Sequence, residues 1–490
     1  MRNASLIART VTIAQAEACA LRTQLRTVTI AQAKACALRT LRTRRGLVRT
    51  CVTLLMLTLS VSTAVPIAER MGYPPEEFTA RRQKLAKTLG GGMVLMFGAS
   101  GPTPGTRFRQ DNDFFYLTGN EALNAALVID APSGTSYLFL PKLTAREIRY
   151  EGGNWLEEAD AAKKYGFATV QPLSELEEFL ARRRVVSGQQ VLWTRLSERD
   201  YVNEGRIDMA IQTARRLINP FAQHPTEDAA RVTALRGHFP YYEMKDISPQ
   251  LDRLRTIKSP REIEILKYNG KISAEALKRA MQATGAGKYE YELEAEAKYW
   301  LVKHGFQGDA YPAIVGSGPM GNQWHYEDNG RQMKAGELVV MDYAGSLDYL
   351  TMDITRTWPV SGRFTDLQLK AYECVLEAQK AIIAAIKPGV TRDTVQSIAE
   401  GIYKKHGFDP RYAYTGHYVG LSVHDVGDWN LPFEAGMVLA IEPIIDLPGL
   451  HIRIEDSVLV TPTGTEILSA GVPKESEEVI ALLRQSTRTN

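Results

Sequence analysis

The sequence predicts an α+β fold, in which a larger, internally duplicated α+β domain follows a smaller α/β domain. Helix-like segments alternate with short apolar runs from residue 65 to residue 246, which is typical of an α/β domain. From residue 247 to residue 480 the order is helices, strands, helices and strands, which favours two similar α+β halves. A chain of 490 residues is also too long for one core, so at least two domains are expected.

The first domain shows its elements as short runs bounded by glycine, proline and aspartate. Helices are predicted at 76–89, 176–184 and 201–217, and strands at 93–99, 125–131 and 136–141. The run FFYLTG at 114–119 is also interpreted as a strand, because aromatic residues and threonine favour strands. No phosphate-binding glycine pattern follows these strands.

The second domain begins with a well-marked helix. Ser259 and Glu262 form a capping box, and Pro260 stands at the first helical position. Two further helices are predicted, from about residue 366 to residue 388 and over residues 392–405. Strands are predicted at AIVGSG, LVVMDYAG, MDITRTW, YVGLSVHDVG, MVLAIEPII, HIRIED and SVLVT.

Two pairs of carboxylates are placed symmetrically about predicted turns. The midpoint of Asp342 and Asp353 falls between Leu347 and Asp348, so in an antiparallel hairpin about that point the two acids face each other. Directly opposed residues have Cβ atoms roughly 5 Å apart. The midpoint of Glu442 and Glu455 falls in the dipeptide Pro448-Gly449. Because Pro-Gly fits a two-residue hairpin imperfectly, this second register is the less firmly determined.

Opposed carboxylates in apolar strands need a partner. They repel each other and are costly to remove from water, and a cation is the usual remedy. Oxygen-rich ligation favours a hard or borderline divalent ion, and four carboxylates can bridge two ions. Ordinary acids at strand edges are the alternative, but two symmetric pairs among Val, Met and Ile favour a metal site.

Histidines complete the candidate site. His417 and His424 are seven residues apart, so on one straight strand they would point to opposite faces, although Gly420 permits a bend. One could bind metal while the other reaches a substrate; the alternative is one core and one surface histidine. His325 lies in a predicted loop 17 residues before Asp342. Arg453 shares a strand face with Glu455 and could neutralise acid, orient a carboxylate or hold a substrate carbonyl.

Residues 1–64 differ from the rest of the chain. They hold ten Lys/Arg and one acid, a balance of +9 against a whole-chain net charge of +3, which leaves −6 for the rest. A near-copy of residues 9–23 follows at 26–40 and matches no repeat fold. Arginines, an apolar run and a small-residue end at Ala64 then predict a signal peptide for secretion or periplasmic export. A mitochondrial transit peptide and a membrane anchor are the weaker alternatives.

The acidic remainder gives no electrostatic reason to expect nucleic-acid binding. It contains one cysteine, Cys374, so it cannot form an internal disulfide. The sequence around Cys374 is helical, which favours a packed helix residue, and no base partner for a nucleophilic thiol is identified.

Residues 250–478 resemble the pita-bread metallopeptidases, in the branch of aminopeptidase P and prolidase. The matching strings are VVMDYAG, MDITRTW, GHYVGLSVHDVG, AIEP and IRIED, and FRQDNDFFYLTG resembles the aminopeptidase P amino-terminal domain. The resemblance implies three parts: a leader (1–64), an aminopeptidase P-type α/β domain (65–246) and a pita-bread catalytic domain (247–480).

The resemblance also implies a dinuclear metal site, often manganese, with cobalt, zinc or iron as alternatives. Its five ligands would be Asp342, Asp353, His417, Glu442 and Glu455. Asp353 and Glu455 would bridge the ions. His325, His424 and Arg453 match substrate-contacting and supporting positions, and Glu442 would also shuttle a proton.

The implied activity is hydrolysis of the bond before proline at the second position of a peptide, by an Xaa-Pro aminopeptidase. The alternatives are a prolidase, which cuts Xaa-Pro dipeptides, and a pita-bread protein that only binds or runs other chemistry. Relatives are often dimers or tetramers. One departure concerns Ala413, which stands where many relatives have a substrate-site histidine four residues before the ligand histidine. The connections from His424 to Glu442 and from Glu442 to Glu455 are also short, which would open the cleft to longer peptides.

Overall fold

The computed structural model describes residues 72–101, 107–221 and 224–486, and its first part is built on a six-stranded mixed sheet. The strand order is β4-β3-β2-β1-β5-β6. β1, β2 and β3 pair antiparallel, whereas β4, β5 and β6 join in parallel. The strands are β1 (Met93–Phe97), β2 (Ala126–Asp130), β3 (Thr135–Leu140), β4 (Thr169–Pro172), β5 (Val191–Thr194) and β6 (Glu243–Asp246).

Both faces of this sheet are covered by helices. Successive residues of a strand point to opposite faces, so Met93 enters the core under α7 and α9 while Val94 enters the core under α3 and α4. This arrangement accords with the expected α/β organisation. The helices are α3 (Pro75–Thr88), α4 (Asn112–Thr118), α5 (Ala145–Glu151), α6 (Ala161–Lys164), α7 (Leu176–Ser187), α8 (Arg206–Leu217), α9 (Glu227–His238) and α10 (Ser248–Thr256).

One predicted strand of this part is wrong. Residues 114–118 of this run lie in helix α4, whose residues are all buried. Asp111 caps the helix by accepting a hydrogen bond from the Phe114 amide, and Gly119 ends it in the left-handed conformation. The capping signals and the packing of the aromatic rings thus outweigh the strand propensity of the run.

The second part repeats one arrangement twice. Helices α11 and α12 precede the three-stranded sheet β11-β9-β8, and helices α13 and α14 precede the four-stranded sheet β12-β13-β16-β17. The helices are α11 (Pro260–Ala283), α12 (Glu290–Lys303), α13 (Asp366–Ala385), α14 (Arg392–His406) and α15 (Ser476–Ser486). The strands are β7 (Gly308–Asp309), β8 (Ile314–Ser317), β9 (Leu338–Asp342), β10 (Gly345–Ser346), β11 (Thr355–Pro359), β12 (Gly416–Tyr418), β13 (Val438–Ile441), β14 (Ile444–Leu447), β15 (Leu450–Arg453), β16 (Asp456–Val460) and β17 (Thr465–Ile467).

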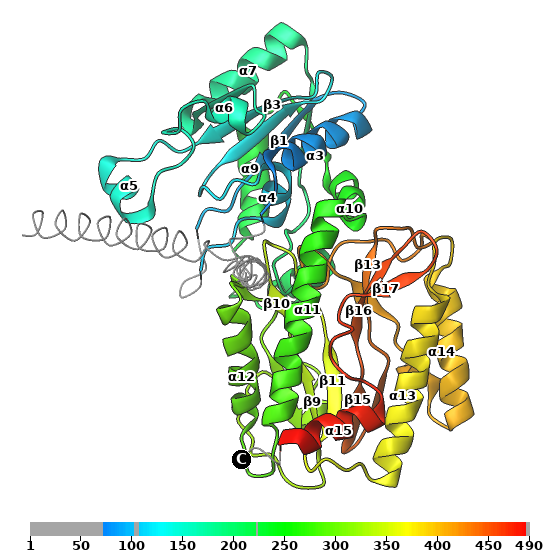
Figure 1. Ribbon diagram of the computed structural model, residues 1–490. Helices are drawn as coiled ribbons and strands as arrows, with labels where there is room; N and C mark the ends of the chain where they lie inside the picture. The colour runs from blue at the N-terminus through cyan, green and yellow to red at the C-terminus, as the bar shows by residue number, and fades with distance from the viewer. Residues whose placement is uncertain (1–71, 102–106, 222–223, 487–490) are drawn as a thin grey trace, which may run out of the picture. The chain divides into compact units, whose positions relative to one another are not determined.

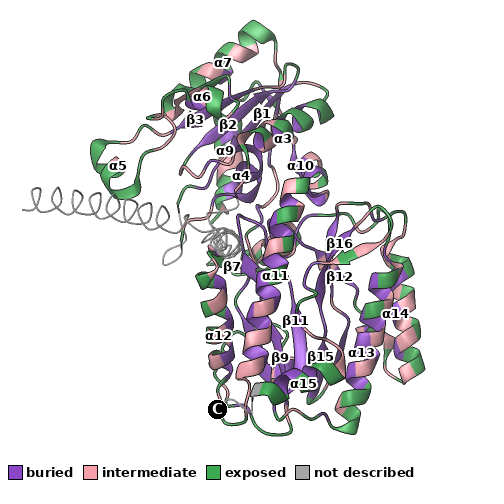
Figure 2. Ribbon diagram, in the orientation of Figure 1, coloured by how far each residue is buried: buried purple, intermediate pink, exposed green. Residues whose placement is uncertain are grey.

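Figure 1 shows the strands of this part between the pair α11 and α12 on one side and the pair α13 and α14 on the other. The strands are buried, and the helices expose their outer faces (Figure 2). The duplicated α+β architecture is therefore confirmed. Residues 68–490 form one compact unit, so the boundary expected at residue 246 separates two sheet systems within that unit.

The register predicted for the first hairpin is wrong by two residues. Asp342 pairs with Thr355 rather than with Asp353. The chain reverses at Asp348 and Tyr349, both with positive φ, and Leu347 pairs with Leu350. This is the conformation of a type I′ turn, and no glycine marks it in the sequence. Because Asp353 is two residues from Thr355, it still lies near Asp342 on the same side of the hairpin.

The register predicted for the second hairpin is correct. Ile441 pairs with Asp456 on one side of the acids, and Ile444 pairs with Arg453 on the other. Continuing this register places Glu442 opposite Glu455. The structure thus contains the register predicted for the hairpin of Glu442 and Glu455, and not the register predicted for the hairpin of Asp342 and Asp353.

The strand expected over residues 418–427 ends after Tyr418. The chain then folds back, with the Gly420 amide donating to the Ser422 carbonyl and the Asp425 amide to the Tyr418 carbonyl. An added Cβ at Gly420 would lie 1.9 Å from the Asp425 carboxylate, so only glycine fits here. The expected bend is therefore present.

The predicted leader, residues 1–64, lies outside the described residues. Among the residues that the structure does describe, no helix combines the length and the apolar character that a membrane crossing requires.

Candidate metal centre

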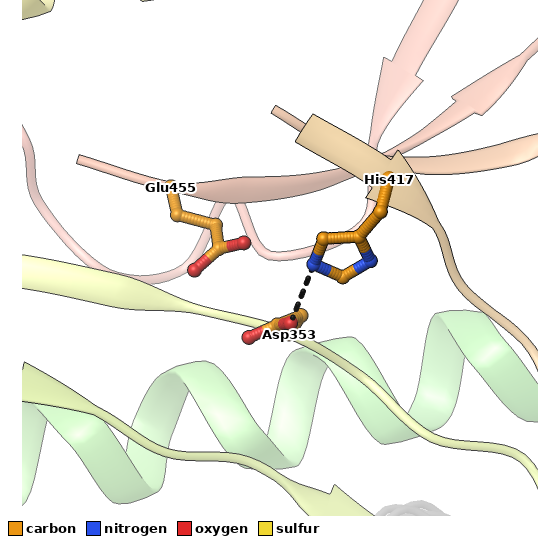
Figure 3. A group of neighbouring side chains, drawn as sticks. All are labelled: Asp353, His417 and Glu455. Atoms are coloured by element: carbon orange, nitrogen blue, oxygen red, sulfur yellow. Dashed lines mark ion pairs between the residues drawn. The ribbon is translucent and has the colours of Figure 1, made fainter. Parts of the chain in front are cut away.

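Three side chains from distant parts of the chain meet in the second part. Asp353 precedes β11, His417 lies on β12 and Glu455 follows β15, and they point toward one another (Figure 3). One ligand atom from each lies within 4.8 Å of the other two. His417 Nε2 lies 3.3 Å from Asp353 Oδ2 and 3.3 Å from Glu442 Oε1, so Glu442 belongs to the same cluster.

Asp342 joins the cluster through two shared neighbours. The Tyr311 hydroxyl lies 2.5 Å from Asp342 Oδ1 and 2.6 Å from Asp353 Oδ1. Arg453 Nη2 donates to Asp342 Oδ2 at 2.7 Å, and its Nε donates to Thr355 Oγ1 at 3.1 Å. The structure thus brings together all five residues predicted as metal ligands, and it places Arg453 where it neutralises and orients one of them.

Burial and mutual repulsion dominate the electrostatics of the carboxylates. Burial first, and then the carboxylates of Asp353 and Glu442, raise the pKa of Glu455 well above its ordinary value. Burial likewise raises the pKa of Asp342 and Glu442, although Arg453 acts in the opposite direction on both. The cluster therefore holds more negative charge than its single arginine can stabilise.

Asp353 and His417 form the exception. Burial alone would raise the pKa of Asp353, but the hydrogen bond and charge of His417 outweigh it and lower that pKa. Burial would likewise lower the pKa of His417, yet its contacts with Asp353 and Glu442 raise it to about 9. A proton on His417 therefore supplies positive charge that stabilises the ionised forms of the neighbouring carboxylates.

Within the described part of the chain, one buried carboxylate oxygen of the cluster has no hydrogen-bond partner. Glu455 Oε2 accepts a hydrogen bond from Thr355 Oγ1 at 2.7 Å, whereas Oε1 is buried without any hydrogen-bond partner. Burying a carboxylate oxygen without a hydrogen-bond partner costs free energy, and a bound cation would offset that cost. Four carboxylates and one imidazole form a donor set that suits divalent cations, so the residues present fit the metal centre expected from the sequence.

The two neighbouring histidines lie at the same site. The rings of His417 and His424 meet edge to face, with their centroids 4.4 Å apart, because of the reversal at Gly420. The alternative of one core and one surface histidine is therefore wrong. His424 Nδ1 also lies 2.9 Å from Asp208 Oδ2 on α8.

His325 lies apart from this contact network. It occupies an exposed turn after the 3-10 helix at Gly318–Asn322, and no hydrogen bond or ion pair within the described part of the chain joins it to the cluster. Its charge does act on Glu204, whose pKa is raised by burial and by Asp208. His325 thus lies near the segment of the first part that contacts His424.

Sequence reasoning missed three neighbours of the cluster. Thr355 follows Asp353 by two residues, so the strand period could have identified it. Tyr311 comes from the connection between β7 and β8, and Asp208 comes from the first part of the chain. No local pattern indicates Tyr311 or Asp208, because only the tertiary fold brings these residues to the cluster.

We expect Glu455→Gln to stabilise the metal-free protein while weakening metal binding. The folded-state pKa of Glu455 is raised, so its ionisation penalty is absent below the unfolded-state pKa of about 4.3 and grows as the pH rises. In chelator-treated protein, the variant should therefore exceed the parent by at least about 1 kcal/mol at pH 8 and by much less at pH 4. Urea unfolding at several pH values measures this difference.

Glu478→Gln, an exposed change on α15, serves as the control and should show no such pH-dependent gain. A chelator-treated Glu455→Gln protein that is less stable than the parent at pH 8 would show that the ionised Glu455 carboxylate does not destabilise the metal-free fold.

Comparison with known proteins agrees with this geometry. The family model for metallopeptidase family M24 matches residues 264–462, and the model for the aminopeptidase P N-terminal domain matches residues 78–193. The Xaa-Pro aminopeptidase of Escherichia coli is 32% identical, over 83% of this chain and 97% of its own length.

Two further relatives and one solved structure extend the comparison. Human Xaa-Pro aminopeptidase 3 is 30% identical over 78% of each chain. An Xaa-Pro dipeptidase of Pyrococcus furiosus is 35% identical, but over only 46% of this chain. The structure of E. coli aminopeptidase P with the inhibitor Pro-Leu superposes with a TM-score of 0.72 at 29% identity, covering 85% of this chain and all of that one.

Proposed function

Because the chain belongs to metallopeptidase family M24 and has the pita-bread fold, we propose that it is an Xaa-Pro aminopeptidase. It would remove the first residue from peptides that have proline at the second position. The convergence of the five predicted ligand side chains, in which Glu455 Oε1 has no hydrogen-bond partner among the described residues, is the observation that carries the hydrolytic part of this proposal. The Xaa-Pro specificity is supported by relatives that match both parts of the chain.

The proposed centre takes two divalent ions, with manganese as the first choice. Asp342, Asp353, His417, Glu442 and Glu455 would hold them. When bound, the ions supply Lewis acidity that activates water and polarises the peptide carbonyl. They would also supply the positive charge that the carboxylate cluster lacks.

The remaining steps, proton transfer and the positioning of the substrate and of the ligand side chains, are assigned to residues of the protein. Glu442, whose pKa is raised by burial, would take a proton from the attacking water and pass it to the proline nitrogen. His424 beside His417 would assist this proton transfer, by taking up a proton at the ring nitrogen that faces the substrate and passing it toward the proline nitrogen. His325 would approach the substrate from its turn, and Arg453 would keep Asp342 ionised and oriented.

The residue at position 413 gives the substrate site a distinct form. Ala413 is fully buried in the core, and its carbonyl accepts a hydrogen bond from Gln396. The next residue, Tyr414, is partly exposed, and burial together with Glu442 raises the pKa of its phenol. Because position 413 is a buried alanine, Tyr414 is a polar side chain of this loop that would stand near the substrate in place of a histidine.

The substrate test compares an Xaa-Pro-Yaa tripeptide with an Xaa-Pro dipeptide on the manganese-loaded protein. An aminopeptidase cleaves the tripeptide, releasing Xaa, at a higher kcat/KM than the dipeptide. Cleavage of the dipeptide alone would instead assign a prolidase, as in the P. furiosus relative. Binding of metal without cleavage of either peptide would contradict both assignments and direct attention to the loop at Ala413.

Export and self-association complete the proposal. The arginines, apolar run and small-residue end of residues 42–64 support secretion or periplasmic export, with cleavage near Ala64. Sequencing of the mature amino terminus tests this. A homodimer or homotetramer is proposed by analogy with the family, and light scattering measures it.

A further inference from the structure

A segment of the first part of the chain reaches the loop that carries His424. The Val202 carbonyl accepts a hydrogen bond from the Val423 amide at 2.8 Å. Gly205 packs directly on the backbone of His424, where an added Cβ would lie 2.2 Å from the His424 carbonyl oxygen. The contact of Asp208 Oδ2 with His424 Nδ1, at 2.9 Å, is thus one of three contacts between these segments.

Asp208 is held firmly at the start of α8. Its Oδ2 also accepts the Gly205 amide at 3.0 Å, which caps the helix. Arg206 anchors the same turn, because its Nε donates to Asp252 Oδ1 at 2.9 Å and its Nη2 donates to Asp113 Oδ2 at 2.9 Å. The carboxylate that meets His424 therefore has a fixed position.

The His424 loop is anchored by the same group of buried charges. Asp425 accepts hydrogen bonds from Arg255 Nη2 at 2.6 Å and from Lys258 Nζ at 3.0 Å. Arg255 Nη1 also donates to Asp113 Oδ1 at 2.8 Å, and Asp113 in turn binds Arg206. One network thus fixes both partners of the contact, the helix turn that carries Asp208 and the loop that carries His424.

This contact decides which nitrogen of the His424 ring bears hydrogen. A carboxylate only accepts hydrogen bonds, so Nδ1 must be the donor. Nε2 has no hydrogen-bond partner within the described residues, and the ring lies edge to face against His417. Because the ring orientation is fixed at Nδ1, Nε2 is left available on a side chain that remains 36% exposed.

We propose that Asp208 is the positioning residue for His424, and that it holds the ring in the Nδ1-protonated form with Nε2 available to the substrate. This inference rests on the proposed role of His424 in the peptidase reaction. In this proposal, a residue of the amino-terminal part of the chain orients a side chain of the active site. The competing explanation is that Asp208 only caps α8.

Steady-state kinetics of the full-length, manganese-loaded protein on an Xaa-Pro-Yaa tripeptide separate the two explanations. We expect Asp208→Ala to lower kcat by about 10- to 100-fold with KM nearly unchanged, because the substrate still binds while the histidine is misplaced. Asp208→Asn keeps an acceptor oxygen and should recover most of the activity. Glu147→Ala is the matched control, since Glu147 caps α5 through the same third helical position but lies in a fully exposed turn.

A double-mutant cycle tests whether Asp208 acts through His424. If it does, Asp208→Ala changes kcat by less than about twofold when introduced into His424→Ala. An equal loss in both backgrounds would overturn the proposal, and so would an equal loss in Asp208→Ala and Glu147→Ala.

A measurement that does not depend on activity separates this proposal from the proposed function. In zinc-loaded, diamagnetic protein labelled with nitrogen-15 histidine, the resonances lost in His424→Ala identify that ring. The parent should show the Nδ1-protonated form, and Asp208→Ala should show a mixture of forms. A ring protonated at Nε2 in the parent would refute the positioning role, whether or not the protein cleaves Xaa-Pro peptides.

Discussion

Replacing Asp353 with alanine is expected to abolish peptidase activity and to remove most of the bound metal. Asp353 contacts His417 directly, shares Tyr311 with Asp342 and belongs to the three-residue group with Glu455. No other carboxylate of the described residues makes all of these contacts, so none of them can replace it. We expect the loss of kcat/KM to exceed about a thousandfold, measured with a tripeptide while metal is counted by elemental analysis.

Asp393→Ala is the matched control, because Asp393 is an exposed acid on α14. It should keep both metal and activity. An Asp353→Ala protein that still cleaves Xaa-Pro peptides at the parent rate would refute the assignment of the cluster as the catalytic centre.

Replacing Arg255 with leucine is expected to cause the largest loss of stability, about 3–5 kcal/mol. Its guanidinium is almost completely buried and contacts three buried carboxylates, those of Asp113, Asp200 and Asp425. Removing it deprives these three buried carboxylates of a charged hydrogen-bond donor that they share. Urea unfolding followed by circular dichroism measures the loss, and activity should fall with it because Asp425 adjoins His424.

The control for this prediction is Arg182→Leu. Arg182 pairs with Glu178 on the surface of α7, where both side chains are largely exposed and a lost ion pair has little effect on stability. Equal unfolding midpoints for Arg255→Leu and the parent would show that the buried network does not hold the fold together.

The elements of the fold were largely predictable because local signals mark them. The capping box at Ser259 starts α11 as expected, and the apolar runs at 93–99 and 125–131 form β1 and β2. Helix α4 replaces the strand predicted over 114–119, because the aromatic residues favour a strand while capping by Asp111 favours the helix. The shift in the first hairpin has a similar cause, because its turn uses Asp348 and Tyr349 instead of glycine.

The candidate site was predictable only in part. The four acids and the histidine ligand are identifiable because they stand in apolar strands and match family strings, and the structure brings them together. Tyr311 and Asp208 could not be found in this way, since their neighbours are more than thirty residues distant in the sequence. Contacts of this kind depend on the tertiary fold, which no local pattern encodes.

The most direct test of the account is a count of metal ions bound to the purified full-length protein after reconstitution with manganese and gel filtration. We expect about two ions per chain, lost together with tripeptide cleavage on chelation and restored with it when manganese is returned. A protein that binds no metal, or that cleaves Xaa-Pro-Yaa peptides equally well after complete chelation, would contradict the interpretation of the paired carboxylates.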